Sequence, residues 1–272
     1  MYGVKWAYFD LDGTLIPHNQ KIANRTIMAL MYLQSKGIKI GIATGRSYFF
    51  TQSIANKLNV DLPIICVNGS WIVKKENFSH LYEEHIDFAS QTEILRTLNE
   101  KQLDYMVYTT EGIYSTSEKF PFYKRLQEIK ETVSCTVNYE FRVEADRRFY
   151  KNLKILKILT YFHDEKEKIQ LVNLVKEFKD VSCASSQKNI LDIFSKNADK
   201  SIALKMLMQK HNIKHHEIIV FGDNENDIKM FELSSKSVAL ANASEKVKRY
   251  AKRKTDLTCE EEGVADFIFR NF

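Results

Sequence analysis

The sequence predicts an α/β fold, in which a doubly wound parallel sheet carries a second, inserted α+β domain. Two patterns indicate this fold. Short apolar, β-branched runs alternate with amphipathic segments at both ends of the chain, as in sheets that are wound with helices. Between the two ends, from about residue 83 to residue 187, helical and strand-like segments follow one another without that regular alternation. The chain of 272 residues is long enough for two domains.

The amino-terminal part of the chain shows the order strand, helix, strand, helix, strand. Its apolar runs are short and rich in β-branched and aromatic residues, and the segments between them have apolar residues at helical spacing. We therefore expect strands over 4–9, 38–43 and 63–67 and helices over 22–35 and 47–58. Gly37 is placed to end the first helix, and a hairpin is expected over 71–82.

The carboxyl-terminal part resumes the alternation. We expect helices over 199–209, 228–233 and 244–254 and strands over 217–221 and 237–240. Within the insertion, we expect helices over 91–101 and 165–178, strands over 105–109 and 153–160, and a charged loop or helix over 138–151. The core domain is thus predicted to comprise 1–82 and 188–272, and the inserted domain 83–187.

Composition and charge narrow the class of protein. Hydrophobic residues make up 44% and charged residues 28% of the chain, an ordinary soluble balance. The net charge of +5 slightly favours small anionic ligands, but no basic block resembles a nucleic-acid-binding arm, so no nucleic-acid partner is expected. No apolar run predicts a membrane span, and no signal peptide is visible. The four cysteines are dispersed, which favours free thiols, and we expect a cytoplasmic monomer or weak homo-oligomer.

Two aspartates stand at the end of the first predicted strand. In an extended chain, residues two apart point the same way, so Asp10 and Asp12 leave the strand on one side, and Gly13 allows a turn. Paired carboxylates repel each other unless a cation lies between them, and hard cations such as Mg2+ prefer oxygen ligands. The pattern therefore favours a metal site over the alternatives of an Asp-rich surface turn, a calcium-type loop or a strand cap.

Polar residues recur at the other strand ends. Asp10, Thr44, Asn68 and Asp223 each follow directly after a predicted strand. Since the carboxyl ends of parallel strands share one edge of a sheet, we expect these residues to meet in one cleft. A surface acidic loop has no reason to recur at every strand end, so the placement itself indicates a functional site.

Four motifs, in the family's order, resemble those of the haloacid dehalogenase-like (HAD) hydrolases. DLDGT at 10–14 resembles the first motif, TGR at 44–46 the second, Lys200 the third, and GDNENDIKM at 222–230 the fourth. The insertion between the second and third motifs is similar to that of the Cof-type branch, which carries a large α/β cap of type C2. The resemblance covers the whole chain and implies a Rossmann-like HAD core with an inserted cap that determines substrate specificity.

The resemblance also implies a phosphatase mechanism with Mg2+ as cofactor. Asp10 would attack phosphorus and become an aspartyl-phosphate, and Asp12 would act first as general acid and then as general base. Lys200 would be catalytic because its positive charge can interact with the phosphate and with the Asp10 carboxylate. The ion would be held by Asp10, the main-chain oxygen of Asp12, and Asp223, whereas Asp227 would orient the metal's surroundings or Lys200 without binding the ion.

The same resemblance assigns phosphate or substrate contacts to a set of polar side chains and main-chain amides. They are the Leu11 amide, Thr44, the Gly45 amide, Arg46, Asn68, Lys200 and Asn226. Thr44 and Gly45 precede a predicted helix, whose first N–H groups favour anions. Arg46 has two open roles, a substrate contact or an ion pair with a structural carboxylate.

The expected substrate is a small phosphorylated metabolite, because a cap that closes over the site excludes water and larger partners. Sugar phosphates, flavin mononucleotide and pyridoxal phosphate all fit the branch. A group of side chains in the inserted domain could contact the substrate, or they could be ordinary exposed charges. They are Arg142, Arg147, Arg148, Tyr150 and Lys151.

Two other functions fit the motifs. A phosphomutase of the same superfamily would return the phosphoryl group to its product instead of to water. A regulatory protein with a residual site would bind a phosphorylated ligand without turnover. The complete acidic set argues against the second alternative, since Asp12 is needed for turnover more than for binding.

Overall fold

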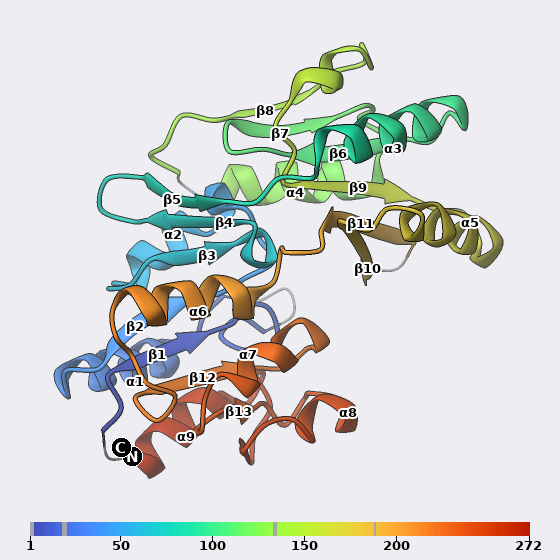
Figure 1. Ribbon diagram of the computed structural model, residues 1–272. Helices are drawn as coiled ribbons and strands as arrows, with labels where there is room; N and C mark the ends of the chain where they lie inside the picture. The colour runs from blue at the N-terminus through green and yellow to red at the C-terminus, as the bar shows by residue number, and fades with distance from the viewer. Residues whose placement is uncertain (1–2, 18–20, 133–134, 188) are drawn as a thin grey trace. The chain divides into compact units, whose positions relative to one another are not determined.

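The chain folds into two compact units (Figure 1). The computed structural model describes residues 3–17, 21–132, 135–187 and 189–272. The first unit comprises Met1–Leu81 and Asp199–Phe272, and the second is Tyr82–Ala198. The sequence places the end of the insertion at 187, whereas the structure places it at 198, because strand β11 (Ile190–Ser195) pairs with strands of the inserted unit.

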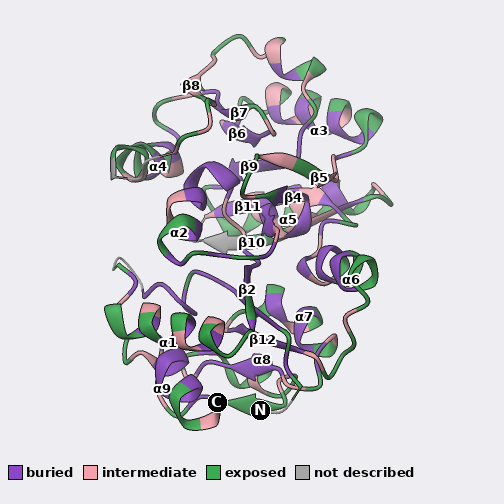
Figure 2. Ribbon diagram, turned by 90° about the vertical axis from the view of Figure 1, so that its left-hand side faces the viewer, coloured by how far each residue is buried: buried purple, intermediate pink, exposed green. Residues whose placement is uncertain are grey.

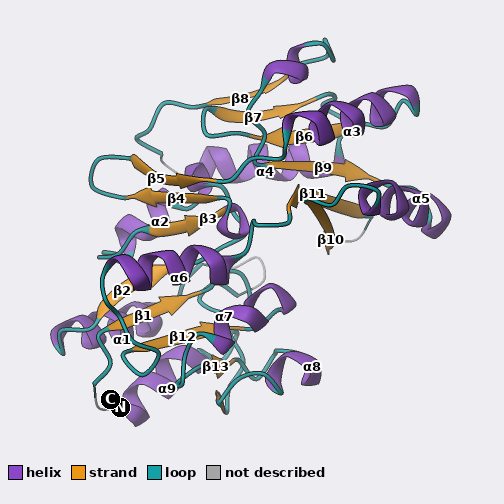
Figure 3. Ribbon diagram, in the orientation of Figure 1, coloured by secondary structure: helices purple, strands orange, loops and turns teal. Residues whose placement is uncertain are grey.

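A parallel sheet forms the centre of the first unit (Figure 3). Its strands, in spatial order, are β14 (Arg253–Lys254), β13 (Val238–Ala239), β12 (Ile218–Gly222), β1 (Trp6–Phe9) and β2 (Lys39–Ile42). Phe9 lies opposite both Phe221 and Ile42, and the rings of Phe9 and Phe221 stack at 4.7 Å. This register aligns the strand ends, so the residues that follow β1, β2 and β12 emerge at one level.

A three-stranded sheet continues from the β2 edge. Its strands are β3 (Ile64–Cys66), β4 (Trp71–Lys74) and β5 (Ser79–Glu83), and β3 and β4 are antiparallel. A single parallel bridge between Ala43 and Ile65 joins β3 to the end of β2. The loop after β3 therefore reaches the same edge as the loops after β1 and β2. The hairpin expected over 71–82 corresponds to β4 and β5.

Helices cover both faces of the parallel sheet. In Figure 2, α1 (Asn24–Ser35) and α9 (Gly263–Asn271) lie on one side of β12, and α6 (Lys200–Lys210) and α7 (Ile228–Glu232) on the other. The strands β1 and β12 between these two layers are wholly buried. The doubly wound α/β fold that the sequence predicts is thus confirmed.

Two predicted helices differ from the structure. The segment 47–58 begins as a 3₁₀ turn (Tyr48–Phe50) before α2 (Gln52–Lys57), because three consecutive buried aromatic residues cannot share one face of an α-helix. The segment 244–254 contains only the short α8 (Glu245–Lys248). It then extends into β14, whose Arg253 amide donates to the Ser237 carbonyl at 3.0 Å. Charged residues are common on such an edge strand.

The second unit has its own mixed sheet, in the order β10, β11, β9, β6, β7, β8. Beyond β11, its strands are β6 (Tyr105–Tyr108), β7 (Gly112–Ser115), β8 (Glu140–Val143), β9 (Lys157–Tyr161) and β10 (Val181–Gln187). The strand expected over 153–160 begins later, at Lys157. The segment 138–151 supplies β8 and part of a 3₁₀ turn (Phe149–Asn152) instead of a loop or α-helix.

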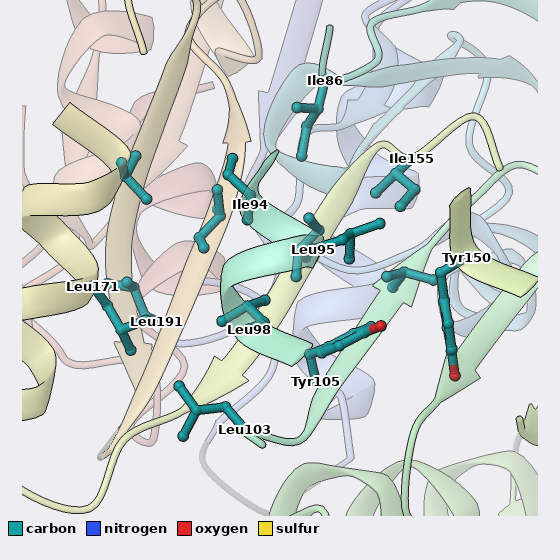
Figure 4. Close-up of a cluster of buried hydrophobic side chains, with 14 of the residues drawn as sticks. Ile86, Ile94, Leu95, Leu98, Leu103, Tyr105, Tyr150, Ile155, Leu171 and Leu191 are labelled. Carbon is teal, nitrogen blue, oxygen red and sulfur yellow. The ribbon is translucent and has the colours of Figure 1, made fainter. Parts of the chain in front are cut away.

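A hydrophobic cluster holds the second unit together (Figure 4). Helices α3 (Phe88–Glu100) and α5 (Glu165–Lys176) contribute Ile94, Leu95, Leu98 and Leu171, which pack against Tyr105 and Leu191 of the sheet. Helix α4 (Pro121–Thr132) contributes no residue to this cluster, and its Tyr123 ring stacks on the Phe141 ring of β8. Across the described residues, none of the helices has the length and apolar character needed to cross a bilayer.

Candidate active site

A buried lysine joins two aspartates at the carboxyl edge of the parallel sheet. Asp10 follows β1, Asp227 lies in the short 3₁₀ turn after β12, and Lys200 is the first residue of α6. The Lys200 Nζ atom donates to Asp10 Oδ1 at 2.6 Å and to Asp227 Oδ1 at 2.8 Å, and the lysine side chain is fully buried. Residues 190 positions apart in sequence therefore form one ion-pair network.

Asp223, directly after β12, lies against the loop that follows β1. Its Oδ1 atom accepts a hydrogen bond from Thr14 Oγ1 at 2.7 Å. Gly13 in that loop has φ +83°, and a Cβ atom on it would lie 2.3 Å from Asp223 Oδ2. Glycine at this position thus permits both the turn and the close approach of the carboxylate.

Asp227 shapes the loop that presents Asp223. Its Oδ2 atom accepts hydrogen bonds from the amides of Asp223 at 3.0 Å and Asn224 at 3.1 Å, while its other oxygen accepts from Lys200. Each oxygen of Asp227 already has a donor. Asp227 thus fixes both Lys200 and the loop that follows β12.

The site carries more negative than positive charge. Carboxylate oxygens of Asp10, Asp223 and Asp227 lie within 4.8 Å of one another, and Lys200 is the ammonium bound to two of these groups. Burial and the neighbouring carboxylates raise the pKa of Asp10 well above its usual range, although Lys200 opposes this shift. Burial and then Asp227 raise the pKa of Asp223 to about 7. Burial would lower the pKa of Lys200, but Asp10 and Asp227 outweigh it and raise that pKa.

A divalent cation fits these residues. One ammonium faces three clustered carboxylates, two of which have raised pKa values, so the site has excess negative charge that a hard cation with oxygen ligands would neutralise. Asp10 and Asp223 are the members of the cluster best able to hold it. Asp227 is fully buried and its two oxygens accept three hydrogen bonds of 2.8 to 3.1 Å, whereas Asp223 is half-buried and its Oδ2 accepts only a long hydrogen bond of 3.4 Å from Asn242.

The Asp12 side chain turns away from this cluster and pairs with Arg46. Arg46 Nε donates to Asp12 Oδ2 at 2.8 Å and Nη2 donates to Oδ1 at 2.5 Å, in a bidentate pair. Burial would lower the pKa of Arg46, but its hydrogen bond with Asp12 outweighs this effect and raises that pKa. Of the two roles open for Arg46, the structure shows the ion pair, and its partner is the predicted acid–base residue itself.

The residues predicted to bind phosphate belong to neighbouring loops. Thr44 is fully buried, its carbonyl accepts from the Asn68 amide at 3.0 Å, and its Oγ1 accepts from the Arg46 amide at 3.1 Å. Asn68 Oδ1 accepts from Asn226 Nδ2 at 3.0 Å, which ties the loops after β3 and β12 together. A Cβ atom on Gly45 would lie 3.0 Å from that same oxygen. The Leu11 side chain is fully buried, so only its main chain is available to a ligand.

Four of the five candidates in the inserted unit have structural partners there. Tyr150 is buried and its hydroxyl donates to the Glu144 carbonyl at 2.7 Å, while Arg147 Nη1 donates to the Leu103 carbonyl at 3.0 Å. Arg142 pairs with two glutamates, and Arg148 pairs with Asp146. Arg142 and Arg148 are exposed charges, whereas Arg147 is half-buried and Tyr150 is buried.

Two neighbours of Asp223 were not predicted as site residues. Thr14 belongs to the DLDGT motif, so its hydroxyl could have been included from the sequence. Asn242 follows β13 after two residues, and its Nδ2 donates to the Gly13 carbonyl at 2.9 Å, while its Oδ1 accepts from the Cys259 amide at 2.9 Å. Asn242 could have been predicted as a site residue from its position just after a strand.

Fold and site together define the class of α/β proteins that carry an acidic site at the carboxyl edge of a parallel sheet. The family model of the haloacid dehalogenase-like hydrolases matches residues 7–268. The chain therefore belongs to this family, and the resemblance of its four motifs is confirmed.

Similar proteins support this assignment. Phosphatase YwpJ of Bacillus subtilis is 29% identical over 290 residues, which cover 97% of this chain and 99% of that protein. The 5-amino-6-(5-phospho-D-ribitylamino)uracil phosphatase YwtE of the same species is 26% identical over 281 residues, with 97% of each chain covered. The crystal structure of TM0651 from Thermotoga maritima superposes with a TM-score of 0.85 at 28% identity, covering 99% of this chain and 98% of that one.

Proposed function

We propose that this hydrolase is a Mg2+-dependent phosphatase that acts on small phosphorylated metabolites. The observation that carries the proposal is the buried contact of 2.6 Å between Lys200 and Asp10, with Asp223 in the same cluster. A carboxylate nucleophile, a fixed positive charge and an oxygen-rich cation site then coincide at one point, as transfer of a charged phosphoryl group requires.

Each residue has a defined part in the proposed reaction. An Asp10 oxygen forms a bond to phosphorus as the bond to the leaving oxygen breaks, and Asp12 gives a proton to that oxygen. Asp12 then takes a proton from water, whose oxygen displaces Asp10 from phosphorus and releases inorganic phosphate. Lys200 offsets charge on Asp10 throughout, and Arg46 holds Asp12 when no substrate is bound.

Mg2+ would be held by Asp10, Asp223 and the main-chain oxygen of Asp12. When bound, the ion neutralises charge on phosphate oxygens that would otherwise repel Asp10. Thr44, the Gly45 and Leu11 amides, Asn68 and Asn226 belong to the four loops after β1, β2, β3 and β12, and we assign them to phosphate or substrate binding. Asn68 links three of these loops through its hydrogen bonds with Thr44 and Asn226.

The proposed substrates are sugar phosphates, flavin mononucleotide or pyridoxal phosphate, with the inserted unit selecting among them. The relative YwtE is named for a ribityl phosphate ester, which supports an alcohol carrying several hydroxyl groups as the leaving group. The proposal includes a cytoplasmic location, which four free cysteines support, and a monomer or weak homo-oligomer without a nucleic-acid partner.

Release of inorganic phosphate from p-nitrophenyl phosphate and sugar phosphates tests the function. Asp10→Asn should abolish release in the presence of Mg2+, whereas Asp256→Asn, which changes an exposed carboxylate, should leave it intact. In water labelled with 18O, the label should appear in free phosphate. Normal turnover by Asp10→Asn contradicts the mechanism, and phosphoryl return to product without label indicates a phosphomutase.

A further inference from the structure

A cavity of about 670 Å³ lies at the amino edge of the parallel sheet, opposite the edge that carries the carboxylate cluster. Trp6 begins β1 and Lys39 begins β2, and both residues line this cavity. Its other walls include the segment before β3, the end of β4 and the end of α6. All of its lining residues belong to the first unit. We call it the amino-edge cavity.

Part of the lining is apolar and held in place. Trp6 is 5% exposed, and its ring lies edge-on to the ring of His211 at 5.3 Å. The Pro63 carbonyl accepts a hydrogen bond from the buried Tyr8 hydroxyl at 3.0 Å, which ties this wall to β1. Leu81, also in the lining, is 37% exposed. The cavity therefore offers a fixed apolar surface to a flat ring.

Lysines from four separate segments surround this surface. Lys5 precedes β1, Lys39 begins β2, Lys74 ends β4 and Lys210 ends α6, and all four are exposed. Lys5 already pairs with Glu217 at 2.6 Å. The other three have no ion pair with any described carboxylate. Three ammonium groups at this cavity are thus available to a ligand.

Two carboxylates, Asp61 and Glu76, also line the cavity. Asp61 Oδ2 accepts hydrogen bonds from the Ile40 amide and from Gln34 Nε2, each at 2.9 Å, so this oxygen holds the start of β2. Four lysines against two carboxylates leave an excess of positive charge, which an anion would offset. Lysine binds phosphate as a point charge, so phosphate groups match this part of the lining.

The size and the two parts of the lining favour one class of ligand. Pockets for small molecules usually enclose about 300–1,000 Å³, and the amino-edge cavity falls within this range. A nucleoside di- or triphosphate combines a planar base with two or three phosphate groups in one molecule. Inorganic phosphate or pyrophosphate would use the lysines alone, and an uncharged nucleoside would use the apolar surface alone.

The amino-edge cavity is separate from the carboxylate cluster. Trp6 begins β1 and Asp10 follows its end, roughly 13 Å away along an extended strand. Lys200 and Lys210 are likewise the first and last residues of α6. In Figure 1, the end of α6 and the start of β1 lie on the same side of the first unit. A ligand in the cavity therefore contacts none of the residues assigned to phosphoryl transfer.

We propose that the amino-edge cavity binds a nucleoside di- or triphosphate, with the base against Trp6 and His211 and the phosphate groups among Lys39, Lys74 and Lys210. This site is additional to the proposed phosphatase site. The inference does not depend on that function, because none of these residues belongs to the carboxylate cluster.

Calorimetric titration of the full chain with adenosine 5′-(β,γ-imido)triphosphate, a nonhydrolysable analogue of ATP, tests the inference. The titration is done in EDTA, so that no Mg2+ supports binding of phosphate at the carboxylate cluster. We expect saturable binding of one molecule per chain. Tripolyphosphate and adenosine should each bind at least about tenfold more weakly than the analogue, because each lacks one of the two parts that the lining contacts.

Variants then locate the bound analogue. Lys39→Gln combined with Lys210→Gln removes two unpaired ammonium groups and should weaken binding at least about tenfold. Lys205→Gln removes a charge from an exposed position of α6 that does not line the cavity, and it should leave the affinity within about twofold. In a Trp71→Phe background, Trp6 is the remaining tryptophan, so its fluorescence should change as the analogue binds.

Three results overturn the inference. The first is the absence of binding by the wild-type chain. The second is binding that the double variant and Lys205→Gln weaken equally, or that leaves Trp6 fluorescence unchanged, since the analogue then lies elsewhere. The third is equal affinity for tripolyphosphate, which shows that the base makes no contact.

Discussion

The Lys200 side chain is fully buried, and burial of its charge is unfavourable unless charged partners offset it. Its ammonium is removed from water at the start of a helix, where a lysine is usually exposed, and only charged partners can offset that desolvation. Asp10 and Asp227 supply these partners at 2.6 Å and 2.8 Å. The lysine therefore holds two strand-end loops in place and also supplies the positive charge beside the proposed nucleophile.

Removing this ammonium should affect folding and activity together. Lys200→Met leaves Asp10 and Asp227 buried without their donor, and the free energy of unfolding should fall by about 3–5 kcal/mol when divalent ions are removed. Urea unfolding in EDTA measures this loss, and phosphate release should fall at least a hundredfold in parallel. Lys205→Met, at an exposed position of the same helix, is the control. Unchanged unfolding by Lys200→Met would contradict the structural role.

Variants of Asp12 and Asp223 should have different effects on the rate of the reaction and on Mg2+ affinity. The Asp12 carboxylate points to Arg46 and lies outside the carboxylate cluster, so Asp12→Asn should lower kcat by about 10²–10⁴-fold and leave Mg2+ affinity nearly unchanged. Asp223→Asn should instead weaken Mg2+ binding. Titration of activity with Mg2+ measures both effects. Equal losses of Mg2+ affinity in the two variants would argue against the assigned roles.

At the scale of elements, the loop after β1 requires glycine at position 13. Gly13→Ala places a Cβ atom 2.3 Å from Asp223 Oδ2 and forces a non-glycine residue to φ +83°. We expect the Asp223 carboxylate to shift and Mg2+ affinity to fall by about ten- to a hundredfold. Calorimetric titration with Mg2+ measures the change.

Gly37→Ala is a matched control for that prediction. Gly37 also has positive φ, at +78°, but no atom lies within 4 Å of a Cβ placed on it. This variant should therefore show the backbone strain alone, with lower stability and unchanged Mg2+ affinity. If both variants weaken Mg2+ binding equally, strain and not the position of Asp223 is responsible.

The sequence predicts elements best where an apolar run is followed directly by a polar loop. The apolar runs that became β1, β2 and β12 each lead directly into a polar loop, and this is why Asp10, Thr44 and Asp223 could be placed at one edge. The helix expected over 244–254 is too long, because helical spacing could not reveal that Arg253 pairs with Val238 of β13. Pairing between distant strands also decides that β11 belongs to the inserted sheet.

Long-range side-chain contacts were the least predictable part of the site. The pattern of strand ends places Lys200 and Asp227 in the same region, but it cannot show that one ammonium bridges Asp10 and Asp227. Nor can it show that Arg46 pairs with Asp12, because an arginine at this position can either contact the substrate or form an ion pair with a carboxylate. Local patterns thus identify the participants, and tertiary packing determines their partners.

At the scale of the whole molecule, the carboxylate cluster couples stability to pH. An unfolded aspartate has a pKa near 4, whereas burial and Asp227 raise the pKa of Asp223 to about 7 in the folded chain. Between these two values the folded state binds more protons than the unfolded state. Stability must therefore fall as pH rises from about 4 to about 7, and burial of Asp10 acts in the same direction.

A bound cation should oppose this loss of stability at higher pH, because its charge neutralises the carboxylates after their protons have dissociated. Without divalent ions, we expect the melting temperature to fall between about pH 5 and pH 8, and millimolar Mg2+ should raise it more at the higher pH, where the carboxylates are ionised. Thermal unfolding with and without Mg2+ at both values measures this difference. Asp223→Asn removes one of the two carboxyl groups with raised pKa values, so it should weaken the pH dependence and reduce the Mg2+ effect. An equal Mg2+ effect at both pH values would show that the ion binds elsewhere than at these buried carboxylates.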